Sequence, residues 1–107
     1  MTNQDIWKEA TTRQLAIALA DVKTVSDMQN LLRDLMTETE ITEMSARLEA
    51  ARLLREGAKY TEIVESTKLS SRTIARISNW LKNGKNGYYI ALDAIKAHHA
   101  HVSPASD

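Results

Sequence analysis

A chain of 107 residues with 43% apolar and 26% charged side chains has the composition of one soluble globular domain. The absence of cysteine excludes disulfides and thiolate zinc sites, and the longest apolar run, residues 15–20, is too short to span a bilayer. Three glycines, one proline and no phenylalanine favour helices over a turn-rich β fold. Because no basic and apolar leader precedes residue 10, we expect a cytoplasmic, all-α protein with no membrane contact.

The net charge is zero, but the charges are unevenly distributed along the chain. Residues 1–46 carry four basic and eight acidic side chains, a net of −4, whereas residues 47–85 carry nine basic and four acidic ones, a net of +5. Residues 86–107 add one basic and two acidic side chains, a net of −1. The basic middle of the chain predicts a polyanionic partner, and a solvated helix surface without a partner is the alternative.

Apolar residues recur at helical spacing throughout and predict about six helices. The first is predicted from about Asp5 to Ala20. The second opens at Thr24, which together with Asp27 resembles a capping box. Its apolar residues fall at i, i+3, i+4, i+7 and i+8, which is the pattern of an amphipathic helix; they are Met28, Leu31, Leu32, Leu35 and Met36.

Two further helices flank the basic middle of the chain. The polar run 37–39 is interpreted as a separator, after which a third helix runs from about Glu40 to Glu56 and ends at Gly57 in the left-handed conformation. The last helix is predicted from about Tyr88 to His99. Four aromatic residues lie in apolar patterns and are predicted to anchor the core or an interface between subunits: Trp7, Trp80, Tyr88 and Tyr89.

Between these helices lies a predicted helix-turn-helix at about residues 60–82. Thr61 is the predicted N-cap of its first helix and Ser70 that of its second, with Lys68 in the turn. The apolar residues of the two helices are expected to pack together and fix the crossing angle; they are Ile63, Val64, Ile74 and Ile77.

The opposite face of the second helix suits a surface that reads bases. Arginine pairs with guanine and asparagine with adenine, and a small side chain permits close approach. The helix N-terminus and nearby hydroxyl and lysine side chains suit phosphates. The predicted DNA-binding residues are Thr61, Lys68, Ser70, Ser71, Arg72, Thr73, Ala75, Arg76, Asn79 and Lys82.

Four segments carry a resemblance to a known family. They are RLEAARLLREG at 47–57, YTEI at 60–63, SSRTIAR at 70–76 and LKNGKNGY at 81–88. Together they resemble the Trp-repressor superfamily and, more narrowly, its YerC/YecD branch. The resemblance implies a single domain over residues 1–107 that forms an intertwined homodimer. The helices at about 5–56 and 88–100 would make the shared core, and the two helix-turn-helix units would face successive major grooves of double-stranded DNA.

The chain departs from that family at two places. The turn of the helix-turn-helix usually carries glycine in the family, whereas Lys68 stands here, with an expected strain of about 1 kcal/mol. Trp repressors also hold tryptophan with an arginine on the preceding helix and with glycine and serine late in the recognition helix. The corresponding residues are Ala46, Ile77 and Trp80, so only Arg76 matches the charged pair. The resemblance therefore implies a regulator that does not use tryptophan.

Other chemistry finds little support. No phosphate loop, catalytic triad order or His-Glu-x-x-His motif occurs, so we expect no enzymatic activity and no cofactor. His98, His99 and His101 lack a carboxylate to complete a metal site, and none is expected. We expect a sequence-specific transcriptional regulator that acts as a repressor. The alternative is a helical interaction module that uses its basic face on an acidic protein.

Overall fold

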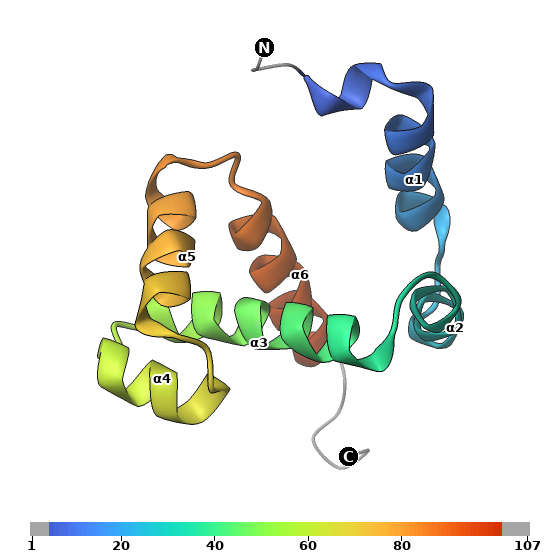
Figure 1. The fold of residues 1–107 in the computed structure, drawn as a ribbon. Helices are drawn as coiled ribbons and strands as arrows, with labels where there is room; N and C mark the ends of the chain where they lie inside the picture. The colour runs from blue at the N-terminus through green and yellow to red at the C-terminus, as the bar shows by residue number, and fades with distance from the viewer. Residues whose placement is uncertain (1–4, 102–107) are drawn as a thin grey trace. The chain divides into compact units, whose positions relative to one another are not determined.

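The computed structural model describes residues 5–101, with side chains as far as His99. These residues form a short 3-10 helix, Ile6–Lys8, and six α-helices (Figure 1). The helices are α1 (Ala10–Asp21), α2 (Val25–Leu35), α3 (Glu38–Arg55), α4 (Tyr60–Thr67), α5 (Ser71–Asn83) and α6 (Gly87–His101). No strand occurs in the described part, and the predicted all-α class is confirmed. The chain divides into two compact units, Met1–Ile41 and Thr42–Asp107.

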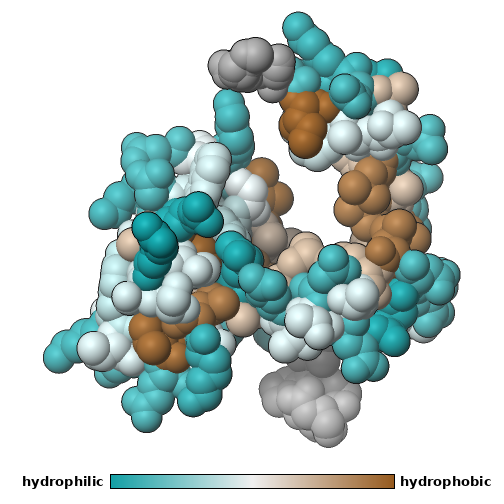
Figure 2. All heavy atoms as spheres, in the orientation of Figure 1, coloured by the Kyte–Doolittle hydropathy of each residue, from teal (hydrophilic) through white to brown (hydrophobic). Residues whose placement is uncertain are grey.

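The first unit has no core of its own. None of residues 5–41 is buried, although α2 carries the predicted apolar stripe. Ile17 on α1 is 61% exposed and Leu35 on α2 is 52% exposed. Trp7 is half-exposed and does not lie in the core of the single chain, and its predicted role at an interface between subunits stays a prediction. Hydrophobic side chains of this unit stand at its surface (Figure 2).

The start of the chain corrects the first predicted helix. Residues 6–8 form a 3-10 turn, and Glu9 is extended at φ −78° and ψ 136°, so α1 begins only at Ala10. The hydroxyl of Thr12 stabilises this break by donating to the carbonyl oxygens of Ile6 and Glu9. The predicted cap of α2 is confirmed, because Thr24 Oγ1 accepts from the Asp27 N–H at 3.0 Å.

A capping box sets the start of α3. Thr37 Oγ1 accepts from the Glu40 N–H at 3.1 Å, and Glu40 Oε1 accepts from the Thr37 N–H at 2.9 Å. The interpretation of residues 37–39 as a separator is therefore wrong, and the helix begins at Glu38. The predicted left-handed Gly57 after the helix is confirmed at φ 88°.

The second unit is built around one buried cluster. Two fully buried alanines of α3, Ala50 and Ala51, belong to this cluster, and their small side chains leave room for larger ones from other helices. Ile63 of α4 and Ile74 of α5 are also fully buried. In Figure 1, α4 and α5 lie beside the carboxyl-terminal part of α3. The complete cluster is Ala50, Ala51, Ile63, Ile74, Ile77, Leu81 and Leu92.

A charged clamp joins α6 to the end of α3. Arg55 Nη2 lies 2.9 Å from Asp93 Oδ1, and the Arg55 guanidinium carbon lies 5.1 Å from the centre of the Tyr89 ring. Tyr88 and Tyr89 both pack against the buried cluster, which confirms their prediction as core residues. The clamp therefore places α6 beside the core that also supports α5.

Lys68 is left-handed, as the resemblance suggested for its position. Its φ is 65°, and its N–H donates to the Val64 carbonyl oxygen at 2.8 Å to close α4. A side chain makes this conformation costly, because the Cβ crowds the following carbonyl oxygen. The turn therefore has the left-handed geometry with a backbone strain that glycine at this position would not have.

We expect Lys68→Gly to raise the free energy of unfolding by about 0.5–1 kcal/mol, because glycine adopts positive φ without strain. Urea denaturation at fixed protein concentration measures it. Lys59→Gly is the matched control, since Lys59 is extended at φ −77° and glycine there should lower stability. Destabilisation of equal size by both variants would show that the Lys68 turn stores no strain.

Candidate nucleic-acid interface

Three residues, 68–70, join α4 to α5 and are tightly hydrogen-bonded. The Thr67 hydroxyl donates to the Ile63 carbonyl oxygen at 2.7 Å and accepts from the Leu69 N–H at 3.3 Å. These bonds, with that of Lys68, satisfy the end of α4 locally. The turn therefore fixes how α5 leaves α4.

The predicted N-cap of α4 is wrong by two residues. Helix α4 begins at Tyr60, with Lys59 in the capping position, so Thr61 lies within the first turn. The cause is Glu62, whose Oε1 accepts from the Lys59 N–H at 2.9 Å and satisfies that donor without a hydroxyl cap. Thr61 remains exposed at the amino-terminal end of the helix.

The predicted N-cap of α5 is confirmed. Ser70 Oγ accepts from the Thr73 N–H at 3.1 Å, and the Ser70 hydroxyl lies 3.1 Å from Thr73 Oγ1, to which it donates. The N–H groups of Ser71 and Arg72 have no partner within an α-helix because they belong to its first turn. This end of α5 therefore presents two donors and the positive end of the helix dipole to an anion.

Helix α5 has one buried and one exposed face. Ile74 and Ile77 are at most 1% exposed and Leu81 is 9% exposed. Thr73 is half-buried, and every other predicted DNA-binding residue is exposed. The predicted residues of α5 and the turn before it are thus exposed on one side of that helix, whereas Thr61 is exposed in the first turn of α4; the former are Lys68, Ser70, Ser71, Arg72, Ala75, Arg76, Asn79 and Lys82.

The arginines of α3 are all paired with carboxylates. Arg47 Nη2 lies 3.1 Å from Glu43 Oε2, and Arg52 contacts Glu49 at 2.6 Å and Glu56 at 2.8 Å. The hydrogen bond from Arg52 holds the pKa of Glu49 below its ordinary value. The α3 arginines thus form ion pairs, Arg55 with Asp93 included, and little of their charge is left for a partner.

The basic residues around α5 are not paired. Within residues 5–101, no carboxylate lies within ion-pair distance of the six cations from Lys59 to Lys85. No acidic residue occurs between Glu65 and Asp93 in the sequence. These six cations therefore have no ion-pair partner in the described chain; they are Lys59, Lys68, Arg72, Arg76, Lys82 and Lys85.

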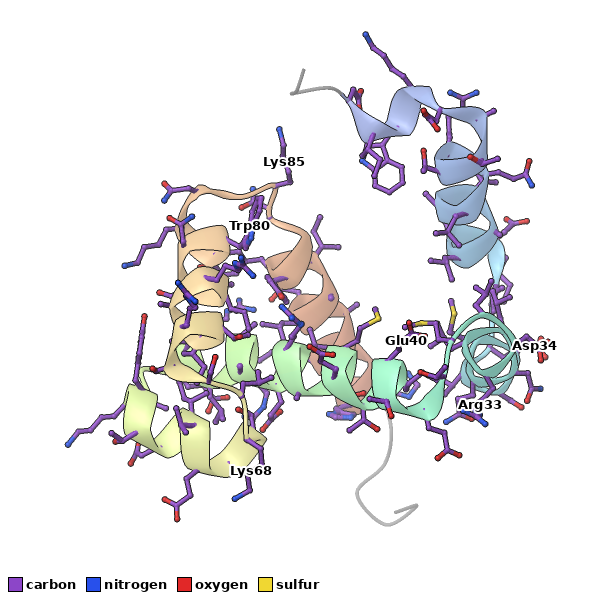
Figure 3. The ribbon with its side chains drawn as sticks, in the orientation of Figure 1. Arg33, Asp34, Glu40, Lys68, Trp80 and Lys85 are labelled. Carbon is purple, nitrogen blue, oxygen red and sulfur yellow. The ribbon has the colours of Figure 1, made fainter. Side chains whose placement is uncertain are left out.

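Two features at the end of α5 were not predicted. Asn83 Nδ2 donates to Asn79 Oδ1 at 2.9 Å. The sequence signal that could have predicted this bond is the i, i+4 spacing of the two asparagines on the polar face. Trp80 is 53% exposed and does not lie in the core of this chain, and its predicted role at an interface between subunits stays a prediction. The Trp80 side chain lies near the end of α5 (Figure 3). A Cβ added at Gly84 would come 2.7 Å from the Trp80 Cε3 atom, so the indole lies against this glycine.

Metal and membrane chemistry find no site in the described part of the chain. No group of three side chains capable of holding a metal ion occurs there. The His98 and His99 rings are tilted, with centres 6.1 Å apart, and the His101 side chain lies outside the described residues. None of the described helices has the length and apolar character needed to cross a bilayer.

Comparisons with known proteins place the chain in a family. The family model described as Trp repressor protein matches residues 10–96. The uncharacterized protein YerC of Bacillus subtilis (strain 168) is 37% identical over 83 residues, which are 78% of this chain and 80% of that protein.

Two crystal structures share the fold. A TrpR like protein from Eubacterium eligens ATCC 27750 has a TM-score of 0.78 at 31% identity, covering 84% of this chain and 93% of that one. A Trp repressor-type protein from Staphylococcus aureus has a TM-score of 0.77 at 25% identity, covering 87% and 96%. With a family match from α1 into α6 and these structural relatives, the chain belongs to the Trp repressor protein family and is of the YerC type.

Proposed function

We propose that this protein is a sequence-specific DNA-binding transcriptional regulator that acts as a repressor in the cytoplasm. The observation that carries the proposal is the exposed face of α5, where Arg72 and Arg76 have no carboxylate partner in the described chain, unlike the arginines of α3. Membership of the Trp repressor family supports it, since that family is regulatory rather than enzymatic.

The side chains divide into two roles by their chemistry. Arg72, Ser71 and Asn79 read base edges in the major groove, where arginine and amide side chains make specific hydrogen bonds. Ala75 lies between them and allows the helix to sit deep. The remaining predicted residues bind phosphates, or cap the helix N-terminus that faces a phosphate. They position the protein on the duplex and do not read its sequence; they are Thr61, Lys68, Ser70, Thr73, Arg76 and Lys82.

We expect Arg72→Ala to weaken binding to a selected duplex by about 1–3 kcal/mol and to relax preference at one base pair, because a guanidinium-base contact is lost. Lys82→Ala should weaken binding to all sequences alike and reduce the slope of log K against log salt by about 1. Gel shifts on selected and random duplexes at two salt concentrations measure both quantities.

Lys23→Ala is the matched control for loss of a positive charge, because Lys23 is 79% exposed and pairs only weakly with Asp21 at 3.7 Å. It should leave affinity and slope unchanged. Binding to random duplex that ignores salt would contradict the DNA proposal and favour an acidic protein as the partner.

The protein acts as a homodimer under this proposal. An amphipathic helix is stable when its apolar stripe is covered, and residues 5–41 hold two such helices without one buried residue. A second copy provides the cover, as the intertwined arrangement implied by the family resemblance would. Two copies also supply two recognition helices for two half-sites.

We expect sedimentation to give about twice the chain mass of 12.0 kDa for the wild-type protein. Leu35→Glu should yield monomer or unfolded chain, because it puts a charge on the apolar stripe of α2. Asn30→Glu, on the opposite side of the same helix, should remain a dimer. A wild-type monomer, or a dimer of Leu35→Glu with wild-type affinity, would refute this assembly.

The regulator works without tryptophan. Three positions correspond to those at which Trp repressors hold the amino acid. Ala46 offers no charge to a carboxylate, and the Ile77 side chain is only 1% exposed, so it is packed within the core. Trp80 adds an indole at the end of α5 where the family has a small residue. These three side chains remove both the charge and the room that the ligand would need.

Calorimetric titration with L-tryptophan should therefore give no saturable heat, and the affinity for a selected duplex should be the same with and without millimolar tryptophan. Tyrosine and indole, titrated in parallel, control for weak adsorption to exposed apolar side chains. Saturable tryptophan binding that tightens DNA affinity would show that the pocket survives, since the two binding events would then be linked.

A further inference from the structure

A side-chain hydrogen bond joins two asparagines on the exposed face of α5. Asn83 Nδ2 donates to Asn79 Oδ1 at 2.9 Å. Arg72 and Arg76 continue the same stripe, because positions 72, 76, 79 and 83 fall within about 60° of one another on a helix that turns about 100° per residue. The bonded pair therefore lies in line with the unpaired guanidinium groups.

The bond decides which groups Asn79 offers to a partner. A carboxamide has one acceptor oxygen and an NH₂ group with two donors. Asn83 engages the oxygen of Asn79, while the NH₂ group has no protein partner among residues 5–101. The bond also restricts rotation of an exposed side chain, which lowers the entropy lost when that side chain binds.

The end of α5 keeps Asn83 in place. The Gly84 N–H donates to the Trp80 carbonyl oxygen at 2.8 Å, and a Cβ at Gly84 would lie 2.5 Å from that oxygen, so this tight closure requires glycine. The Trp80 indole lies against the same glycine, since a Cβ there would come 2.7 Å from its Cε3 atom. The last turn of α5 is therefore closed and holds Asn83 one helical turn from Asn79.

We propose that Asn83 is a positioning residue that holds the Asn79 amide with its NH₂ group outward, so that Asn79 donates to an acceptor atom of DNA. This inference rests on the proposed function. Two sources of acceptor fit: guanine N7 or O6 and thymine O4 on the groove floor, and phosphate oxygens. The bidentate asparagine–adenine contact needs the amide oxygen as well. The bond to Asn83 uses one of the two lone pairs of that oxygen and turns the oxygen along the helix towards Asn83, which disfavours the adenine pairing expected from sequence.

A double-mutant cycle on the full chain tests this role. Duplexes are selected from a random pool by the wild-type protein, and the affinity of the best one is measured for Asn83→Ala, Asn79→Ala and the double variant. Asn83→Ala should weaken binding about three- to tenfold, the range for one neutral hydrogen bond. In the Asn79→Ala background it should have no further effect.

Asn83→Asp separates the two sources of acceptor. Its carboxylate cannot donate, so it accepts from Asn79 Nδ2 and turns the Asn79 oxygen outward. If Asn79 reads a base, repeated selection should move one position of each half-site toward adenine or cytosine, which present amino groups. If Asn79 binds a phosphate, affinity should fall for all sequences, by more than in Asn86→Asp. That control adds the same charge in the following turn, outside the bonded pair.

The outcomes are distinguishable. An Asn83→Ala protein with wild-type affinity and wild-type sequence preference overturns the positioning role, as does an Asn83→Ala loss that persists undiminished in the Asn79→Ala background. Circular dichroism should show all variants folded, since alanine is favourable at the end of a helix. A wild-type protein that binds no duplex in a salt-dependent way overturns the proposed function as well.

Discussion

The burial of Ile63 and Ile74 against the small side chains of α3 is the contact on which the rest of the second unit depends. Both isoleucines are fully buried in one cluster with Ala50 and Ala51, whose small side chains leave room for them. Burying an isoleucine contributes about 1.5–3 kcal/mol, a large share of the stability of a small domain. Since this contact orients the inner face of α5, it also determines which residues face outward.

Charge pairing then distinguishes two helices that both carry arginines. Those of α3 meet carboxylates of the same helix or its neighbours, whereas α5 contains no acidic residue and its two arginines have no carboxylate partner in the described chain. A paired surface arginine is a weak attractor of anions, because its field is largely cancelled nearby. The zero net charge of the chain is therefore compatible with a local polyanion-binding surface on α5.

The sequence predicted the helices and the faces of α5 well, because apolar periodicity reports burial directly. The predicted starts of two helices were wrong, because a side chain near each start accepts a hydrogen bond from a backbone N–H group. Glu62 moved the start of α4 to Tyr60, and Thr37 with Glu40 moved that of α3. For two aromatic residues the sequence left the core and a subunit interface open, and Trp7 and Trp80, which lie in apolar patterns, are about half exposed in the single chain. Periodicity cannot tell a face covered within the chain from one left for a second copy.

Two features of the chain both favour a dimer under the proposed function: residues 5–41 include no buried residue, and only a few cations around α5 are unpaired in the described chain. Under the proposed function, each phosphate neutralised by a cation releases counterions and adds to affinity, so six cations on one chain would give a limited, salt-sensitive affinity for DNA. In a dimer the second DNA contact would be intramolecular, which raises affinity without new kinds of contact. A chain that needs a second copy to cover its first two helices would then bind DNA tightly only as that dimer. On this proposal, dimerisation and tight DNA binding become one requirement, set by an apolar surface and a basic surface on the same short chain.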